Sequence, residues 1–310
     1  MVVLLDGEEE VGSPHLPEVI RQHAGELDAD LVVWSDGPVH DSGLPTITFG
    51  VRGIVAFELR ARGANRPLHS GNWGGVPPNP VWTLVQLLAT MRGPDGKVTI
   101  EGFYDDVVPL TAAERAALER LPVDLAALLG DLGIDAPDEP KEWTVPERLA
   151  AWPTLTINGF QGGSLRHTII PHEAAVRCDA RLVHGMTVQA TFDRIAGHVA
   201  RHAPEVSCRL LGGMEPSRTP LDSPYTEPLR RALLLVEGRE PLLVPALGGS
   251  LPDYVFTRLL GLPSIGVPFA NPDEANHAPN ENLELRRYFN GVKAAAAMLD
   301  QLATVATADG

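Results

Sequence analysis

Short runs of consecutive apolar residues open the chain and return near its end. The first two, Val2–Leu5 and Leu31–Trp34, are each followed by acidic residues and a glycine. Apolar runs of this length are typical of parallel strands that are covered on both faces. The segment 16–27 between them can form a helix, so the start of the chain predicts a buried strand, a helix and a second strand.

The middle of the chain has a different pattern. Apolar and polar residues alternate along 55–62 and again along 176–182, which is typical of half-buried antiparallel strands. Helices are also expected here, because Asn79-Pro80 is a capping residue followed by proline at the first helical position. Thr111 with Glu114 forms a capping box that opens a second helix, expected to run to Leu121.

The pattern of the first segment returns after residue 223 and closes with a helix over 285–302. The fold class is therefore predicted to be α/β, with a mostly parallel sheet assembled from residues 1–50 and 218–310. An α+β domain with an antiparallel sheet is expected to be inserted between them, at residues 51–217.

Charge and composition exclude several classes of partner. The formal net charge of −15 argues against nucleic acid, because phosphates would be repelled. No apolar run approaches the ~18 residues that a membrane-spanning helix needs, so no membrane partner is expected. Cys178 and Cys208 form neither a zinc-finger spacing nor a disulfide framework, which predicts a reducing, cytoplasmic location.

Acidic residues gather where the first two predicted strands end. Glu8, Glu9 and Glu10 follow the first strand and Asp36 follows the second. Carboxyl ends of parallel strands are where open α/β sheets place their ligands, and a divalent cation would offset the repulsion between these carboxylates. On charge alone, a solvated acidic turn at the start of a helix is the more common case.

Other polar residues lie in glycine-rich or turn-rich segments. His277 stands in the loop Asn276–Glu281, and His69 precedes a glycine-lined bend. Arg181 lies on the polar face of its strand, where it could bind a carboxylate in fork geometry. Taken singly, each is more often a surface or turn residue.

Six segments, in this order, resemble one family: GEEEVGS, LHSGNWGG, NGFQGGSLRHTIIP, CDARLV, GGSLP and NHAPNE. The family is that of the dinuclear-zinc peptidases, which includes carnosine dipeptidase, glutamate carboxypeptidase, aminoacylase and succinyl-diaminopimelate desuccinylase. The sequences of these segments are most similar to those of the dipeptidase branch. The resemblance implies an incomplete zinc-peptidase catalytic domain with an inserted lid and dimerisation domain.

The resemblance also implies roles at the metal site. Counted back from Gly12-Ser13, Glu9 matches the general base and Glu10 a ligand of one metal, which leaves Glu8 as the spare glutamate. His277 matches a ligand of the same metal as Glu10, and Asp36 matches a ligand of the other. The implied cofactors are two zinc ions, and manganese or cobalt would suit the same ligands.

Further positions match residues that contact the substrate. Arg181, Gly249 and Ser250 correspond to the residues that hold its terminal carboxylate, and Asn158 lies in a segment that resembles a substrate-facing loop. His69 matches the histidine that reaches into the partner subunit's site. A homodimer through residues 51–217 is therefore expected.

One departure affects the expected activity. The family carries a His-x-Asp motif and a bridging aspartate upstream of the double glutamate, and neither has a match after Met1. We therefore expect the chain as given to be inactive and the complete enzyme to be a hydrolase, a metallopeptidase or dipeptidase acting on short peptides. Two alternatives stay open: an amidohydrolase of N-acyl amino acids, and a non-catalytic dimerising remnant.

Overall fold

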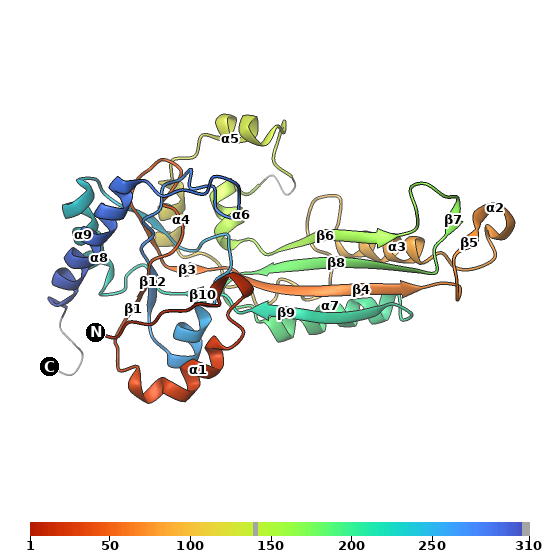
Figure 1. Ribbon diagram of the computed structural model, residues 1–310, viewed down its shortest axis with the longest axis horizontal. Helices are drawn as coiled ribbons and strands as arrows, with labels where there is room; N and C mark the ends of the chain where they lie inside the picture. Colours follow the sequence, from red (N-terminus) through yellow and green to blue (C-terminus); the bar gives the residue numbers. More distant parts are fainter. Residues whose placement is uncertain (139–141, 306–310) are drawn as a thin grey trace.

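The computed structural model describes residues 1–138 and 142–305. Its elements form an α/β part, built from both ends of the sequence, and an elongated arm built from the middle (Figure 1). In chain order, the elements of the α/β part are η1 (Glu9–Val11), α1 (Leu16–His23), η2 (Ala24–Glu26), β1 (Val32–Trp34), β2 (Thr46–Thr48), β3 (Gly50–Val51), β10 (Ser217–Arg218), α8 (Thr226–Glu237), β11 (Leu242–Val244), the π-helix η3 (Val255–Leu260), β12 (Ser264–Gly266) and α9 (Leu285–Leu302).

A mixed sheet in the order β1-β12-β2-β11 forms the centre of the α/β part. The pairs β1–β12 and β2–β11 are parallel, and β12 meets β2 in antiparallel direction at Gly266 and Thr48. Ile47 of β2 and Ile265 of β12 are fully buried against residues of α8 and α9, which lie side by side at one end of the molecule (Figure 1). The predicted α/β class is confirmed.

The predicted first strand is wrong. Val2, Val3, Leu4 and Leu5 belong to no strand, and they are exposed by 51%, 69%, 38% and 91%. Within the described residues, β1 pairs only with β12, so the first residues have no neighbouring backbone with which to form a ladder. An apolar run becomes a strand only where such a partner is available.

The arm is a four-stranded antiparallel sheet with helices on one face and a small two-stranded sheet at its far end. Its elements are β4 (Gly53–Arg62), β5 (Leu68–His69), α2 (Ser70–Trp73), α3 (Pro80–Met91), β6 (Thr154–Gly162), β7 (Ile169–Ile170), β8 (Glu173–Leu182), α7 (Val188–His202) and β9 (Ser207–Met214). The strand order is β6-β8-β4-β9, and β5 pairs with β7. The antiparallel strands expected from the period-two pattern are confirmed.

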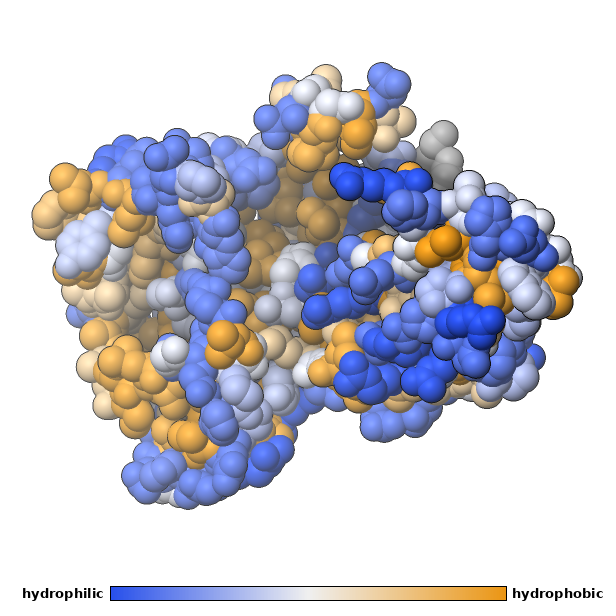
Figure 2. Space-filling model, turned by 45° about the vertical axis from the view of Figure 1, so that its right-hand side comes forward, coloured by the Kyte–Doolittle hydropathy of each residue, from blue (hydrophilic) through white to orange (hydrophobic). Residues whose placement is uncertain are grey.

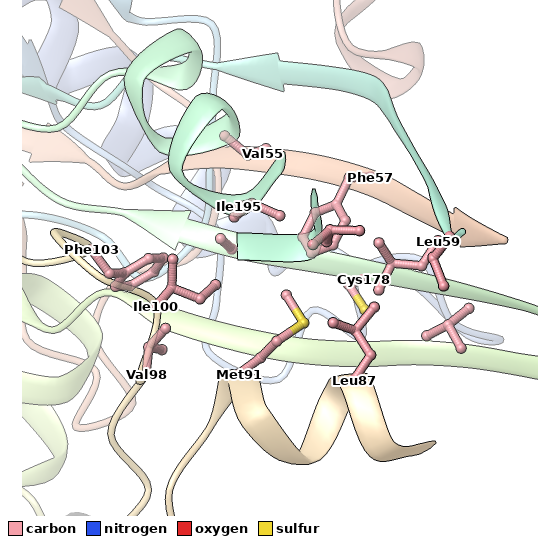
Figure 3. Packing of buried hydrophobic residues seen from close by; sticks show 14 of the residues in the cluster. Val55, Phe57, Leu59, Leu87, Met91, Val98, Ile100, Phe103, Cys178 and Ile195 are labelled. Carbon is pink, nitrogen blue, oxygen red and sulfur yellow. The ribbon is translucent and has the colours of Figure 1, made fainter. Parts of the chain in front are cut away.

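Alternate residues of β4 build the core of the arm. Val55, Phe57 and Leu59 are fully buried, and Figure 3 shows them packed with side chains of α3 and α7, among them Met91 and Ile195. Each such side chain contributes about 1.5–3 kcal/mol when it leaves water. The opposite face of the sheet is polar, which leaves its side chains free for other contacts.

Three further helices, α4 (Ala112–Glu119), α5 (Leu125–Leu132) and α6 (Val145–Ala151), connect α3 to β6. The predicted capping box is present, since Thr111 Oγ1 accepts from Glu114 N–H while the Glu114 carboxylate accepts from Thr111 N–H. The predicted cap of α3 is also present, with Asn79 Oδ1 accepting from Val81 N–H at 3.0 Å.

Helix α5 buries none of its residues, and its apolar side chains are visible at the top of Figure 2. No helix in the described part of the chain is both long and apolar enough to cross a bilayer.

The chain enters and leaves the arm at one place. β3 and β10 pair there in antiparallel direction, and two glycines permit the close approach. A Cβ atom at Gly50 would overlap the carbonyl oxygen of Ser217, and one at Gly53 would lie 2.5 Å from the carbonyl oxygen of Met214. Both predicted domain boundaries fall beside this ladder, and the boundaries themselves stay a prediction.

Candidate active site

The three adjacent glutamates lie in a single 3-10 turn at the junction between the two parts of the molecule (Figure 1). The turn ends at Gly12, which has a left-handed φ of 84° and packs near Met214 Cε at the end of β9. Glycine adopts this conformation without the steric penalty of a side chain. The turn therefore sets its side chains between the α/β part and the arm.

Each of the three glutamates has a different environment. Glu8 is paired with Nδ1 of His15 at 2.9 Å, and Glu10 Oε2 lies 2.7 Å from Nε2 of His277. Among the described residues, the carboxylate of Glu9 has no hydrogen-bond partner, although it is half-buried. Glu9 is thus the member of the cluster whose carboxylate is free to act on another molecule.

The pKa of Glu9 is raised above its ordinary value, first by burial and then by the negative charges of Asp36, Glu10 and Asp6, while His277 opposes the shift. Asp36 stands after β1, where Gly37 N–H donates to its Oδ1 at 2.9 Å. The structure therefore brings Glu9, Glu10, Asp36 and His277 into one electrostatic neighbourhood. A carboxyl group with a raised pKa is suited to accept a proton near neutral pH.

The loop that carries His277 is strained. Ala275, His277 and Asn280 all have a positive φ, of 57°, 58° and 67°; this region is uncommon for any residue other than glycine, and for alanine more so than for histidine or asparagine. Each such residue costs on the order of 1–3 kcal/mol unless its surroundings enforce the conformation. Strain of this kind concentrates at functional sites.

Asn271 enforces that conformation from beneath the loop. It is fully buried, and its amide donates to Asp273 Oδ1 at 2.7 Å and to Asn282 Oδ1 at 3.0 Å. Its own Oδ1 accepts from Glu284 N–H at 2.9 Å. One side chain thus joins the beginning and the end of the loop that presents His277.

A second cluster lies where the polar face of the arm meets the α/β part. Arg181 Nη1 donates to Ser250 Oγ at 2.8 Å, and Arg181 Nε is 3.4 Å from Asp179 Oδ1. Asn158 Nδ2 donates to Asp179 Oδ2 at 2.6 Å. Gly249, next to Ser250, is exposed. The predicted substrate-contacting residues Arg181, Ser250 and Asn158 are therefore brought together.

Arg52 supports this cluster from behind. It is buried, and it donates from Nε to the carbonyl oxygen of Gly248 at 2.8 Å and from Nη1 to that of Arg148 at 3.4 Å. Burial lowers the pKa of Arg52 to about 10, with a further contribution from Arg181 and an opposing one from Asp179. At neutral pH its guanidinium stays charged and fixes the backbone of the loop that ends in Ser250.

His69 is not brought to the other predicted residues. It is exposed on β5, at the far end of the arm, and its Nδ1 accepts from Gly71 N–H at 3.0 Å. A ten-residue strand such as β4 spans about 33 Å. His69 therefore lies far from Glu9 of the same chain.

The donors present match a cation site in type. A carboxylate–imidazole pair with a second carboxylate nearby is the mixture that zinc takes, and the pair Glu10–His277 already meets at a distance of 2.7 Å. Within residues 1–138 and 142–305, no three His, Cys, Asp or Glu side chains converge closely enough to enclose a metal ion. The residues fit part of a metal site.

Three contributors were missed at the sequence level. Asp179 was visible only as a polar residue on its strand, and Arg52 and Asn271 carried no signal. Their roles come from contacts with segments far away in the sequence, such as that of Arg52 with Gly248. A single sequence does not reveal such contacts.

Residues 49–207, just over half of the chain, match the family model of the peptidase dimerisation domain of M20 peptidases. The chain belongs to the M20 peptidase family. The match covers most of the arm and the helices that connect α3 to β6.

Several relatives extend this finding. The Cys-Gly metallodipeptidase dug1 of Schizosaccharomyces pombe is 27% identical over 98% of this chain, and the Beta-Ala-His dipeptidase of Homo sapiens is 25% identical over 97%. This chain spans 66% and 61% of their lengths. The crystal structure of an M20 family metallo-carboxypeptidase from Sulfolobus solfataricus superposes with a TM-score of 0.90 at 30% identity, covering 96% of this chain and 69% of that one. For human carnosine dipeptidase 1 the TM-score is 0.79 at 26% identity, with 96% and 65% covered.

Proposed function

We propose that the complete protein is a metal-dependent hydrolase that cleaves the amide bond of dipeptides or short peptides with a free terminal carboxylate. The observation that carries the proposal is the contact between Glu10 and His277 beside the unpaired carboxylate of Glu9. Membership of the M20 family and relatives described as metallodipeptidases support the same reaction.

Glu10 and His277 would hold one divalent metal ion and Asp36 the other, with two zinc ions as the expected content and manganese or cobalt as substitutes. When bound, such ions supply the Lewis acidity that polarises the scissile carbonyl and activates water. Glu9 accepts the proton of the attacking water and returns it to the leaving amine. Its raised pKa suits both halves of this transfer.

The substrate's terminal carboxylate would be bound at the junction by Arg181, Ser250 and the exposed backbone of Gly249. Asn158 would contribute an amide donor. A guanidinium fork pairs with a carboxylate through parallel hydrogen bonds, which fixes orientation as well as affinity. A site of this kind favours short substrates, because the carboxylate end must lie close to the scissile bond.

His69 would act in the site of a second copy, where it would donate to the developing oxyanion. The length of the arm supports this role, since His69 stands at its far end. The dimer surface is proposed to be the free edge of β6 together with α3. Ile157 and Phe160 of β6 are exposed by 52% and 42%, and Trp82 of α3 by 63%, and exposed apolar edges of this kind are typical of pairing surfaces.

Two measurements test the function. The DNA upstream of Met1, read in the same frame, shows whether a His-x-Asp motif precedes the chain. The longest in-frame product is then assayed with zinc, manganese and cobalt on glycylglycine, cysteinylglycine and N-acetylalanine. Dipeptide cleavage supports the proposal, and preferential deacetylation supports the amidohydrolase. A folded dimer that cleaves neither and takes up no metal supports the non-catalytic remnant.

A cytoplasmic location stays a prediction, based on the free thiols Cys178 and Cys208.

A further inference from the structure

We propose that Asp179 is the positioning residue of the carboxylate-binding cluster, fixing Arg181 and Asn158 so that both present donors to the terminal carboxylate of the substrate. The inference rests on the proposed function for the nature of the ligand. It concerns a residue that touches the two donors and not the reacting atoms.

Asp179 is built into the arm and not free to follow a ligand. Only 7% of its surface is exposed, and it lies on β8 two residues before Arg181, on the same face of the sheet. Its Oδ2 accepts from Asn158 of the neighbouring strand β6 at 2.6 Å, and its Oδ1 lies 3.4 Å from Arg181 Nε. One rigid carboxylate therefore joins both donors.

This arrangement leaves part of the Arg181 guanidinium unused. Nε faces Asp179 and Nη1 donates to Ser250, whereas Nη2 has no hydrogen-bond partner in the described part of the chain. An arginine held at two of its three nitrogens loses little freedom when it binds an anion, because its fork is already oriented. The remaining donor is directed by the hydrogen bond of Nη1 to Ser250 and the ion pair of Nε with Asp179.

The charges of the cluster leave room for one anion. Arg181 lies close enough to Arg52 for its charge to lower the pKa of Arg52, and the charge of Asp179 opposes this effect. Two positive charges against one negative charge give a net charge of +1, which one carboxylate neutralises. Without Asp179, the repulsion from Arg52 would push Arg181 away from its position.

Position and charge predict opposite effects for the substitution Asp179→Asn. By charge alone, removing a carboxylate beside the site would strengthen the binding of an anion. If Asp179 acts by positioning, the variant binds the anion less well, because Asn cannot accept from Asn158 and Arg181 with equal strength. The sign of the change therefore separates the two roles.

The test measures the binding of glycylglycine and of glycylglycinamide to the full chain by NMR titration. The ratio of the two dissociation constants is the preference for a free carboxylate. We expect wild type to prefer glycylglycine and Asp179→Asn to lower that preference about tenfold, the value of a hydrogen bond to a charged group. Glu58→Gln is the matched control, since Glu58 lies on the same face of the sheet and pairs with Arg60 and Arg209 away from the cluster.

Arg181→Lys gives an independent answer should Asp179→Asn fail to fold. Lysine keeps the charge but has a single ammonium group that cannot bond to Asp179 and Ser250 while presenting a further donor. We expect it to lose the preference as well. An unchanged or stronger preference in either variant overturns the proposal, as does a wild-type chain that binds both ligands equally. If the chain prefers glycylglycine but hydrolyses no dipeptide, the proposed function is wrong. The positioning role of Asp179 is unaffected by that result.

Discussion

His277 Nε2 lies 2.7 Å from Glu10 Oε2, although the two residues come from opposite ends of the chain. Their side chains are exposed by 68% and 71%, and an exposed pair of this kind contributes about 0–1 kcal/mol to stability. A contact worth so little does not explain why the loop around His277 carries three residues with positive φ. A role for this loop in presenting the imidazole of His277 to the carboxylate of Glu10 explains both the contact and the unusual backbone of the loop.

Substitutions of Glu9 and Glu10 should have different effects on the metal content of the complete protein. Glu9→Gln removes the proton acceptor but no ligand, so we expect retained metal and a loss of several orders of magnitude in turnover. Glu10→Gln replaces a charged ligand with a neutral amide, so we expect lower metal occupancy together with the loss of rate. Metal content by atomic emission and turnover on a dipeptide measure both effects.

Glu8→Gln is the control for this pair, since Glu8 is engaged with His15. It should change neither quantity. A pure rate loss at Glu8 with metal loss at Glu9 would shift the assignment by one residue.

Asn271→Ala should loosen the loop that carries His277. The substitution leaves the backbone N–H of Glu284 without its acceptor and removes the two donors to Asp273 and Asn282. Buried groups left without partners cost about 1–3 kcal/mol. We expect a lower melting temperature and faster proteolysis within 271–284, whereas Asn276→Ala, at an exposed position of the same loop, should behave as wild type. Equal protease resistance in both variants would exclude this role.

Trp82→Asp should convert the proposed dimer into a monomer. An aspartate on α3 would bring a charge into an apolar interface, where it has no partner. Sedimentation velocity at micromolar concentration measures the change. Leu235→Asp is the matched control, because Leu235 is exposed by 70% on α8 of the α/β part. A dimer that survives Trp82→Asp would place the interface elsewhere.

The pair of Glu114 and Arg218 should stabilise the chain in a pH-dependent way. The side chains are only 5% and 11% exposed, and breaking such a pair by removing one partner costs about 3–5 kcal/mol. Burial alone would raise the pKa of Glu114, but hydrogen bonds from Arg218 and Thr111 outweigh burial and hold that pKa below its ordinary value.

A carboxyl whose pKa is lowered by folding stabilises the folded state above its unfolded pKa, about 4.3 for glutamate, and loses this contribution as the pH falls. Denaturant unfolding should therefore show Glu114→Gln less stable than wild type at pH 7, with a smaller gap below pH ~4. Glu119→Gln, on the same helix but exposed, should show no gap. A gap that grew towards acid would contradict the sign of the pKa shift.

Local chemistry and tertiary contact differ in how well they can be predicted. The caps at Asn79 and Thr111 act within a few residues, so both helices start where the sequence predicts, although α4 ends at Glu119 instead of Leu121. The alternation along β4 and β8 is equally local. The run Val2–Leu5 failed because a strand requires a neighbour, and no pattern within the run reveals whether one is there.

The residues of the candidate site also differ in how well the sequence predicts them. The family resemblance points to Glu9, Glu10, Asp36 and His277, and the fold brings Glu10 into contact with His277 and leaves Glu9 and Asp36 nearby. The supporting residues escape prediction because their partners are distant in the sequence, as with Asn158 and Asp179.

The ladder between β3 and β10 makes the arm a transferable unit. Because its two ends leave the α/β part as adjacent strands, a short turn from residue 51 to residue 217 could replace the whole arm without stretching the host sheet. The same geometry lets another domain with neighbouring termini be grafted there. Gly50 is where such a graft would succeed or fail, since any side chain at this position collides with Ser217 and Arg218 of the strand that returns.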